Sequence, residues 1–93
     1  MITHKPIAES LIEDIDLSIA RLLERKIISE QESFILNARL YLAVHCIRNG
    51  HPESAAHVLE AFIRKVEDLV RSERLDSKEG MTLIRRLLRL LVD

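Results

Sequence analysis

The stretch LLERKIISEQESFILNARL, residues 22–40, decides the fold, because it holds the end of one helix, a turn and the start of the next. Within it, SEQE at residues 29–32 has the pattern of a capping box. In such a box the Ser29 hydroxyl accepts a hydrogen bond from the backbone N–H of Glu32, and the Glu32 carboxylate accepts one from the N–H of Ser29. A helix is therefore predicted to begin here.

Apolar residues on both sides of this turn recur with helical spacing. A first helix is predicted near residues 6–25, with an apolar stripe formed by Ala8, Leu11, Ile12, Ile15, Ile19, Leu22 and Leu23. A second helix carries Leu36, Leu40, Ala43, Val44 and Ile47, and it ends at Asn49, since Gly50 can adopt the left-handed conformation that closes a helix. Two helices joined by a short turn form an antiparallel hairpin.

The second half of the chain repeats this organisation. Pro52 suits the first turn of a third helix, whose stripe is Ala55, Val58, Leu59, Phe62, Val66, Leu69 and Val70. DSKE at residues 76–79 repeats the capping pattern, and the fourth helix carries Leu83, Leu87, Leu90 and Leu91.

A shift of 47 residues aligns the two halves without a gap. Ser29 and Glu32 fall on Asp76 and Glu79, and the following apolar positions correspond in the order Ile28, Phe34, Leu36, Leu40 and Leu75, Met81, Leu83, Leu87. Such agreement indicates a duplicated hairpin, residues 4–49 and 51–93, within one domain spanning residues 1–93. The predicted fold class is all-α, an antiparallel four-helix bundle built from two repeated helical hairpins.

The composition suits one small helical domain. Of 93 residues, 47% are hydrophobic and 31% charged, and two are glycine. A net charge of −1 provides no general attraction to nucleic acid or acidic membranes, so neither is an expected partner. One cysteine cannot form an internal disulfide, and there is neither a signal-peptide pattern nor an apolar run of about 18 residues. A cytoplasmic location is expected, or an extracellular one if the chain is a domain of a secreted protein.

Several short patterns resemble one known family. Ile47 and Gly50 end a helix, Pro52–Ala55 begins the next, and Leu59, Phe62, Ile63 and Val66 form its stripe, before Leu75 and the final Leu83–Leu88 segment. The stretch at residues 22–40 fits the same pattern. This arrangement resembles the FIMAH domain, a small helical module of larger bacterial extracellular hydrolases. The resemblance covers most of the chain and implies a non-catalytic accessory or binding module.

The segment HCIRNGHPESAAH, residues 45–57, gathers the candidate metal or catalytic residues His45, Cys46, His51 and His57. Their spacings differ from the paired spacings of zinc ligands, and the adjacent His45 and Cys46 point about 100° apart on a helix. No metal, cofactor or catalytic residue is therefore predicted. His51, which aligns with His4, is expected to cap the third helix, and Cys46 to be a half-buried apolar residue.

Three arginines give the fourth helix a basic strip. Arg85, Arg86 and Arg89 could contact a small anionic ligand or a nucleotide, which is the alternative function, or could form an ordinary solvated face.

The second and fourth helices carry more apolar residues than an outer bundle helix needs. The residues predicted to form an interface are Ile35, Leu42, Cys46, Met81, Ile84, Leu88, Leu91 and Val92. Packing within the monomer could bury them. Otherwise they would form a contact with a protein partner or with another copy of the chain. The sequence therefore favours a non-catalytic interaction module that self-associates.

Overall fold

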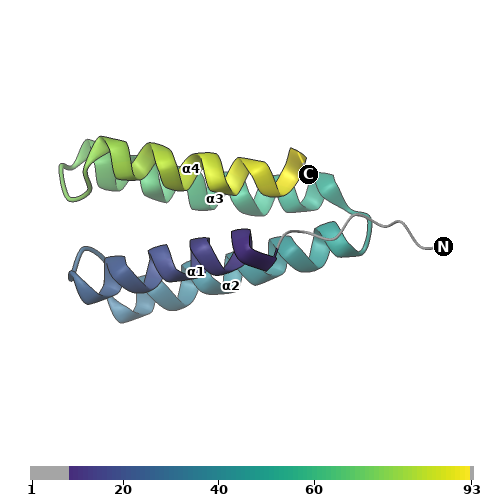
Figure 1. Ribbon diagram of the computed structural model, residues 1–93, viewed down its shortest axis with the longest axis horizontal. Helices are drawn as coiled ribbons and strands as arrows, with labels where there is room; N and C mark the ends of the chain where they lie inside the picture. The colour runs from purple at the N-terminus through teal and green to yellow at the C-terminus, as the bar shows by residue number, and fades with distance from the viewer. Residues whose placement is uncertain (1–8, 93) are drawn as a thin grey trace.

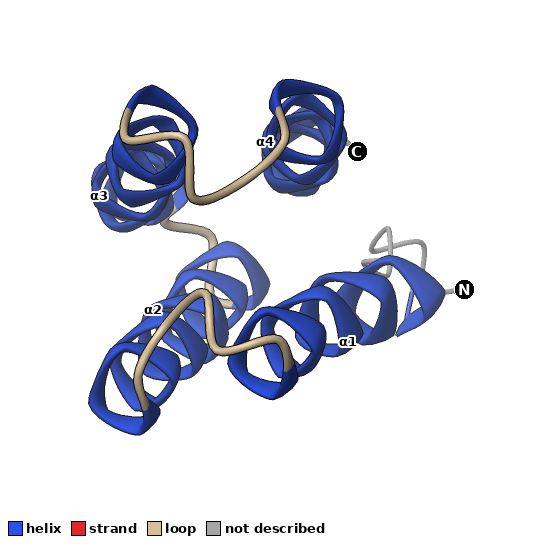
Figure 2. Cartoon of the chain, turned by 90° about the vertical axis from the view of Figure 1, so that its left-hand side faces the viewer, coloured by secondary structure: helices blue, strands red, loops and turns tan. Residues whose placement is uncertain are grey.

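The computed structural model describes residues 9–92, which form four helices. In chain order they are α1 (Glu9–Glu24), α2 (Glu30–Arg48), α3 (Pro52–Arg71) and α4 (Ser77–Val92). Helix α1 contacts α2 and α4, and α3 contacts the same two helices. The four helices therefore stand at the corners of a bundle in which neighbours run antiparallel (Figures 1 and 2). The predicted all-α four-helix bundle is confirmed. His4, Ala8 and the other residues before position 9 lie outside the described residues.

The capping box at the start of α2 is present. The N–H of Glu32 donates to the Ser29 hydroxyl at 3.1 Å, and the N–H of Ser29 donates to the Glu32 carboxylate at 2.8 Å. The same carboxylate accepts a hydrogen bond from the Lys65 ammonium of α3. This bond and the one from the Ser29 backbone lower the pKa of Glu32 from 4.5 to about 2. The cap thus also ties the first hairpin to the second.

The second cap repeats only half of this arrangement. The Asp76 carboxylate accepts from the N–H groups of Lys78, at 3.0 Å, and Glu79, at 3.4 Å, as expected of an N-cap aspartate. The Glu79 carboxylate, however, accepts from Arg25 at 2.8 Å. The expectation of a second complete capping box is therefore wrong for Glu79, because a cation on the neighbouring turn competes for its carboxylate.

The connections after α1, α2 and α3 have the same backbone form. At the first, the N–H groups of Lys26 and Ile27 donate to the carbonyls of Leu23 and Leu22, which is a Schellman motif. At the third, Glu73 and Arg74 donate to Val70 and Leu69 in the same way, and at the second Gly50 and His51 donate to Ile47 and Cys46. Lys26, Gly50 and Glu73 have positive φ angles of 61°, 79° and 64°. Lys26 and Glu73 are 47 positions apart, so the correspondence seen in the sequence at this spacing also holds for the backbone of the two hairpin turns.

Replacing Lys26 or Glu73 with glycine should therefore raise the free energy of unfolding. A left-handed non-glycine residue is strained by about 1–2 kcal/mol, and the greater entropy of glycine in the unfolded chain offsets part of that gain. We expect about 0.5–1 kcal/mol at each position, measured by urea denaturation. Lys26→Ala is the control, since it removes the lysine side chain and keeps the strain. Equal effects of alanine and glycine would contradict the argument.

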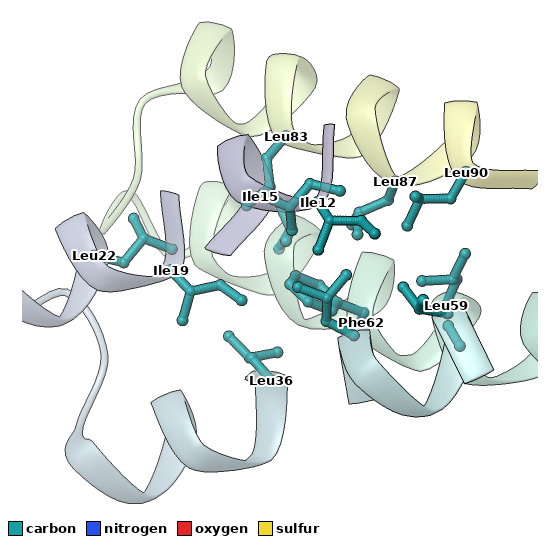
Figure 3. Close-up of a cluster of buried hydrophobic side chains, with 14 of the residues drawn as sticks. Ile12, Ile15, Ile19, Leu22, Leu36, Leu59, Phe62, Leu83, Leu87 and Leu90 are labelled. Carbon is teal, nitrogen blue, oxygen red and sulfur yellow. The ribbon is translucent and has the colours of Figure 1, made fainter. Parts of the chain in front are cut away.

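The core lies along the shared axis of the four helices (Figure 3). Each helix contributes its predicted stripe, and the most deeply buried large side chains are Phe62, Ile15, Ile19, Leu40, Leu59, Leu69, Leu87, Leu90 and Val66. Both hairpin turns lie at the same end of the bundle (Figure 1), and there Ile28 and Leu75 are buried and close that end of the core. At the margins, Leu23, Ile47, Val58, Val70 and Leu91 are only half-buried.

Two residues of the aligned apolar pattern are not core residues. Phe34 is 73% exposed and Met81 is 51% exposed. They precede Leu36 and Leu83 by two positions, and a step of two residues turns a helix by about 200°, so they point away from the core. Their inclusion in the core pattern is corrected, although they still occupy equivalent places in the two hairpins.

A small residue lets the N-terminal part of α4 lie close to the C-terminal part of α3. Gly80 of α4 and Ser33 of α2, which are 47 positions apart, are both buried. A Cβ atom at Gly80 would lie only 2.5 Å from Cγ2 of Val70 on α3. The close approach of α3 and α4 therefore depends on the glycine.

Candidate interaction surfaces

The outward face of α2 is almost free of charge. Arg39 is the sole charged residue between positions 33 and 47 of this helix. Ser33, Leu36, Leu40, Ala43 and Val44 occupy the side buried against the other helices. The opposite sector, here named the α2 outer face, consists of Phe34, Ile35, Ala38, Tyr41, Leu42 and His45. The helix is thus apolar on both its inner and outer sides, which is atypical of an outer bundle helix.

Large side chains on this face are well exposed. Phe34 is 73% exposed, Tyr41 52%, Leu42 50% and Ile35 39%. Two of the chain's three aromatic residues therefore lie outside the core. Ala38, also exposed, stands between them as a small residue.

Tyr41 marks the side of the α2 outer face that borders α1. Its hydroxyl donates to the Asp16 carboxylate at 3.4 Å. Partial burial, and then the charge of Asp16, raise the pKa of Tyr41 above its ordinary value. On the other side, Ile35 and Arg39 line a shallow hollow against α3 together with Arg64 and Lys65.

A smaller apolar surface lies on α4 at equivalent positions. Met81, Leu88 and Val92 are exposed and correspond, 47 residues on, to Phe34, Tyr41 and His45. We name these three residues the α4 outer face. Unlike the α2 outer face, it alternates along the helix with the exposed charges of Lys78, Arg85 and Arg89.

The predicted interface residues divide into two groups. Ile35, Leu42, Met81, Leu88 and Val92 are exposed, so packing within the monomer does not bury them. Cys46, Ile84 and Leu91 are half-buried and pack against the core, as expected for Cys46.

Sequence reasoning misses two surface residues, Phe34 and Tyr41. The aligned pattern places Phe34 among the core positions, and Tyr41 belongs to no predicted face. Their spacing of seven residues within a nearly uncharged helix is the signal that identifies them as partners on one face.

The histidines at the corner between α2 and α3 do not converge. His45, His51 and His57 are exposed, and residues 9–92 contain no group of three or more His, Cys, Asp and Glu residues that could hold a metal ion. The ring of His45 lies 3.2 Å from the Asn49 side-chain amide. His51 occupies the predicted N-cap position of α3, although its side chain makes no capping hydrogen bond.

The three arginines of α4 do not form one strip. Arg86 is half-buried, and its Nη1 donates to the Ser18 hydroxyl of α1 at 3.2 Å. Arg85 and Arg89 are exposed. Arg86 instead joins Arg21, Arg25 and Lys78 around a groove between α1 and α4, of about 230 Å³.

Among the described helices, none has both the length and the apolar character needed to cross a membrane. Comparison of the chain with models of protein families, with curated proteins and with solved structures gave no significant match. A functional proposal for this chain therefore rests on its own surfaces.

Proposed function

We propose that the protein acts without catalysis, as a protein–protein interaction module, and that the α2 outer face joins two copies of the chain. The observation that carries the proposal is the exposure of Phe34, Tyr41 and Leu42 on a sector without charge. Contiguous exposed apolar surface usually marks an association site, and interface cores are enriched in aromatic residues and depleted in charge.

A second copy is the occupant that best suits this face. A two-fold contact pairs one surface with itself, so a surface that is apolar throughout satisfies both partners at once. Ala38 at its centre lets two helices approach closely, with Phe34 and Tyr41 on one side and Ile35 and Leu42 on the other.

The charges beside the face favour parallel α2 helices. Asp16 borders it on the α1 side and Arg39 on the α3 side. A two-fold axis along α2 places the α1 side of one copy opposite the α3 side of the other, so that Asp16 faces Arg39. An antiparallel pairing instead brings the two Asp16 carboxylates to the same side, which is unfavourable.

Leu42→Glu should separate the copies, with Leu17→Glu as its matched control. Leu42 and Leu17 have the same side chain and are 50% and 51% exposed, but Leu17 lies on α1, where Glu13, Asp14 and Arg21 are its helical neighbours. Because burying an unpaired carboxylate costs several kcal/mol, we expect Leu42→Glu to raise the dissociation constant of the dimer at least about 100-fold. Analytical ultracentrifugation over a wide concentration range measures this, and circular dichroism checks that each variant folds.

In this experiment the wild-type chain and Leu17→Glu should both sediment as dimers at concentrations where Leu42→Glu is monomeric. A wild-type chain that stays monomeric at the highest concentrations would refute self-association. If Leu42→Glu and Leu17→Glu raised the dissociation constant of the dimer equally, the α2 outer face would not be the surface that joins the two copies.

A further inference from the structure

The groove between α1 and α4 gathers positive charge from two parts of the chain. Arg21 and Arg25 belong to α1 and the turn after it, whereas Lys78 and Arg86 belong to α4, and all four line the groove. Glu79 supplies the one carboxylate among the lining residues. The whole chain has a net charge of −1, so this excess of cations is a local feature. We name it the basic groove.

Hydrogen bonds hold part of the basic groove in place. The Arg86 guanidinium donates to the Ser18 hydroxyl across the two helices at 3.2 Å, and Arg25 donates to Glu79 at 2.8 Å. Arg86 is half-buried, so fewer of its rotamers are free than on an open surface. Two cations are thus positioned before any ligand arrives, while Arg21 and Lys78 remain on the exposed rim.

The hydroxyl groups of the basic groove are already used as donors. Ser18 donates to the carbonyl of Asp14, and Thr82 donates to the carbonyl of Lys78, both at 2.9 Å. The donors that remain for a ligand are therefore the N–H groups of arginine and lysine, which prefer anionic oxygens. Beneath them, Leu22, Leu75 and Leu83 provide an apolar floor.

We infer that the basic groove binds a small phosphorylated molecule. An arginine guanidinium can donate two parallel hydrogen bonds to two oxygens of one phosphate group. Several cations close together therefore suit a ligand with more than one negative charge, such as a diphosphate or a doubly charged phosphate monoester. The volume of about 230 Å³ is below the usual range for drug-sized ligands, so the ligand is small, with any apolar part resting on the leucine floor. This inference goes beyond self-association, because the basic groove lies between α1 and α4 and the α2 outer face borders α1 and α3 (Figure 2).

Inorganic pyrophosphate is the probe for the test, added to the ¹⁵N-labelled full chain while amide chemical shifts are followed. We expect saturable shifts confined to α1, the adjoining turn and α4, around Ser18 and Thr82. Arg21→Gln and Arg86→Gln should each weaken binding at least tenfold. Arg64→Gln and Arg71→Gln are the controls, because these exposed arginines lie on α3 away from the basic groove and should change affinity less than twofold.

Arg21 is exposed, so its variant tests the inference even if Arg86→Gln impairs folding, which thermal denaturation would detect. Leu42→Glu should bind pyrophosphate as the wild type does, and this separates the inference from the proposed self-association. The inference would be overturned if the amide chemical shifts changed at basic residues of all four helices. It would also be overturned if the α3 control variants lost as much affinity for pyrophosphate as Arg21→Gln and Arg86→Gln. Binding to vesicles of anionic phospholipid without binding of pyrophosphate would overturn it as well, since a free small molecule is what the basic groove is inferred to hold.

Discussion

Replacing Phe62 with alanine should lower the free energy of unfolding by about 4 kcal/mol, the largest effect of any substitution proposed for this chain. Phe62 is fully buried on α3 and is the sole aromatic residue in the core among residues 9–92. Around it lie side chains from the other helices (Figure 3). The alanine no longer gains the free energy of transferring the ring from water to the core. It also leaves a cavity, because the aliphatic side chains around it belong to four closely packed helices and can move into the space only in part.

The chain supplies a matched control for this experiment in Phe34→Ala. Phe34 is 73% exposed, so its truncation in a single copy should change stability by less than about 0.5 kcal/mol. Both substitutions are best made in the Leu42→Glu chain, where loss of association cannot contribute to the measured stability. Urea denaturation followed by circular dichroism gives the difference.

A small domain can unfold completely when its free energy of unfolding falls by about 4 kcal/mol. Phe62→Leu is therefore a milder substitution whose effect can still be measured on a folded protein. Leucine keeps most of the apolar volume, and a loss of about 1–1.5 kcal/mol is expected. If Phe62→Ala and Phe34→Ala proved equally destabilising, the assignment of one phenylalanine to the core and the other to the surface would be wrong.

The fold is predictable from the sequence because its signals are local. The Ser29 capping box, the left-handed Gly50 and the Pro52 helix start are each encoded within a few residues, and the structure confirms them. Periodicity then identifies the buried face of every helix. It fails at Phe34, since a helix that is apolar on two sides offers two stripes and periodicity alone does not say which one faces inward.

The basic groove illustrates what local signals leave out. The sequence identifies Arg86 as a candidate on α4, but its neighbours in space, Arg21 and Arg25, come from the first helix and its turn, far earlier in the chain. Only the contact between α1 and α4 brings them together. For the same reason Glu79 departs from the expected capping box, because Arg25 approaches it from the other hairpin.

Gly80→Val should be the second most destabilising change, lowering the free energy of unfolding by about 3 kcal/mol. The Cβ atom that it adds would lie 2.5 Å from Cγ2 of Val70, far inside van der Waals contact, with Val66 and Leu75 at 3.6 and 3.7 Å. Valine is stiff at χ1 within a helix, so neither its own methyl groups nor those of Val70 can turn aside. The helices α3 and α4 must then separate at this end of the bundle and lose contacts beyond the clash itself.

Two comparisons show whether the loss comes from this contact. Thr82→Val places the same side chain two residues later on the exposed side of α4, and we expect a change within about 0.5 kcal/mol. Val70→Ala removes the methyl group that the new side chain meets, so combining it with Gly80→Val should recover at least about 1 kcal/mol relative to the sum of the separate effects. Additive losses would mean that Gly80 does not set the approach of α3 to α4.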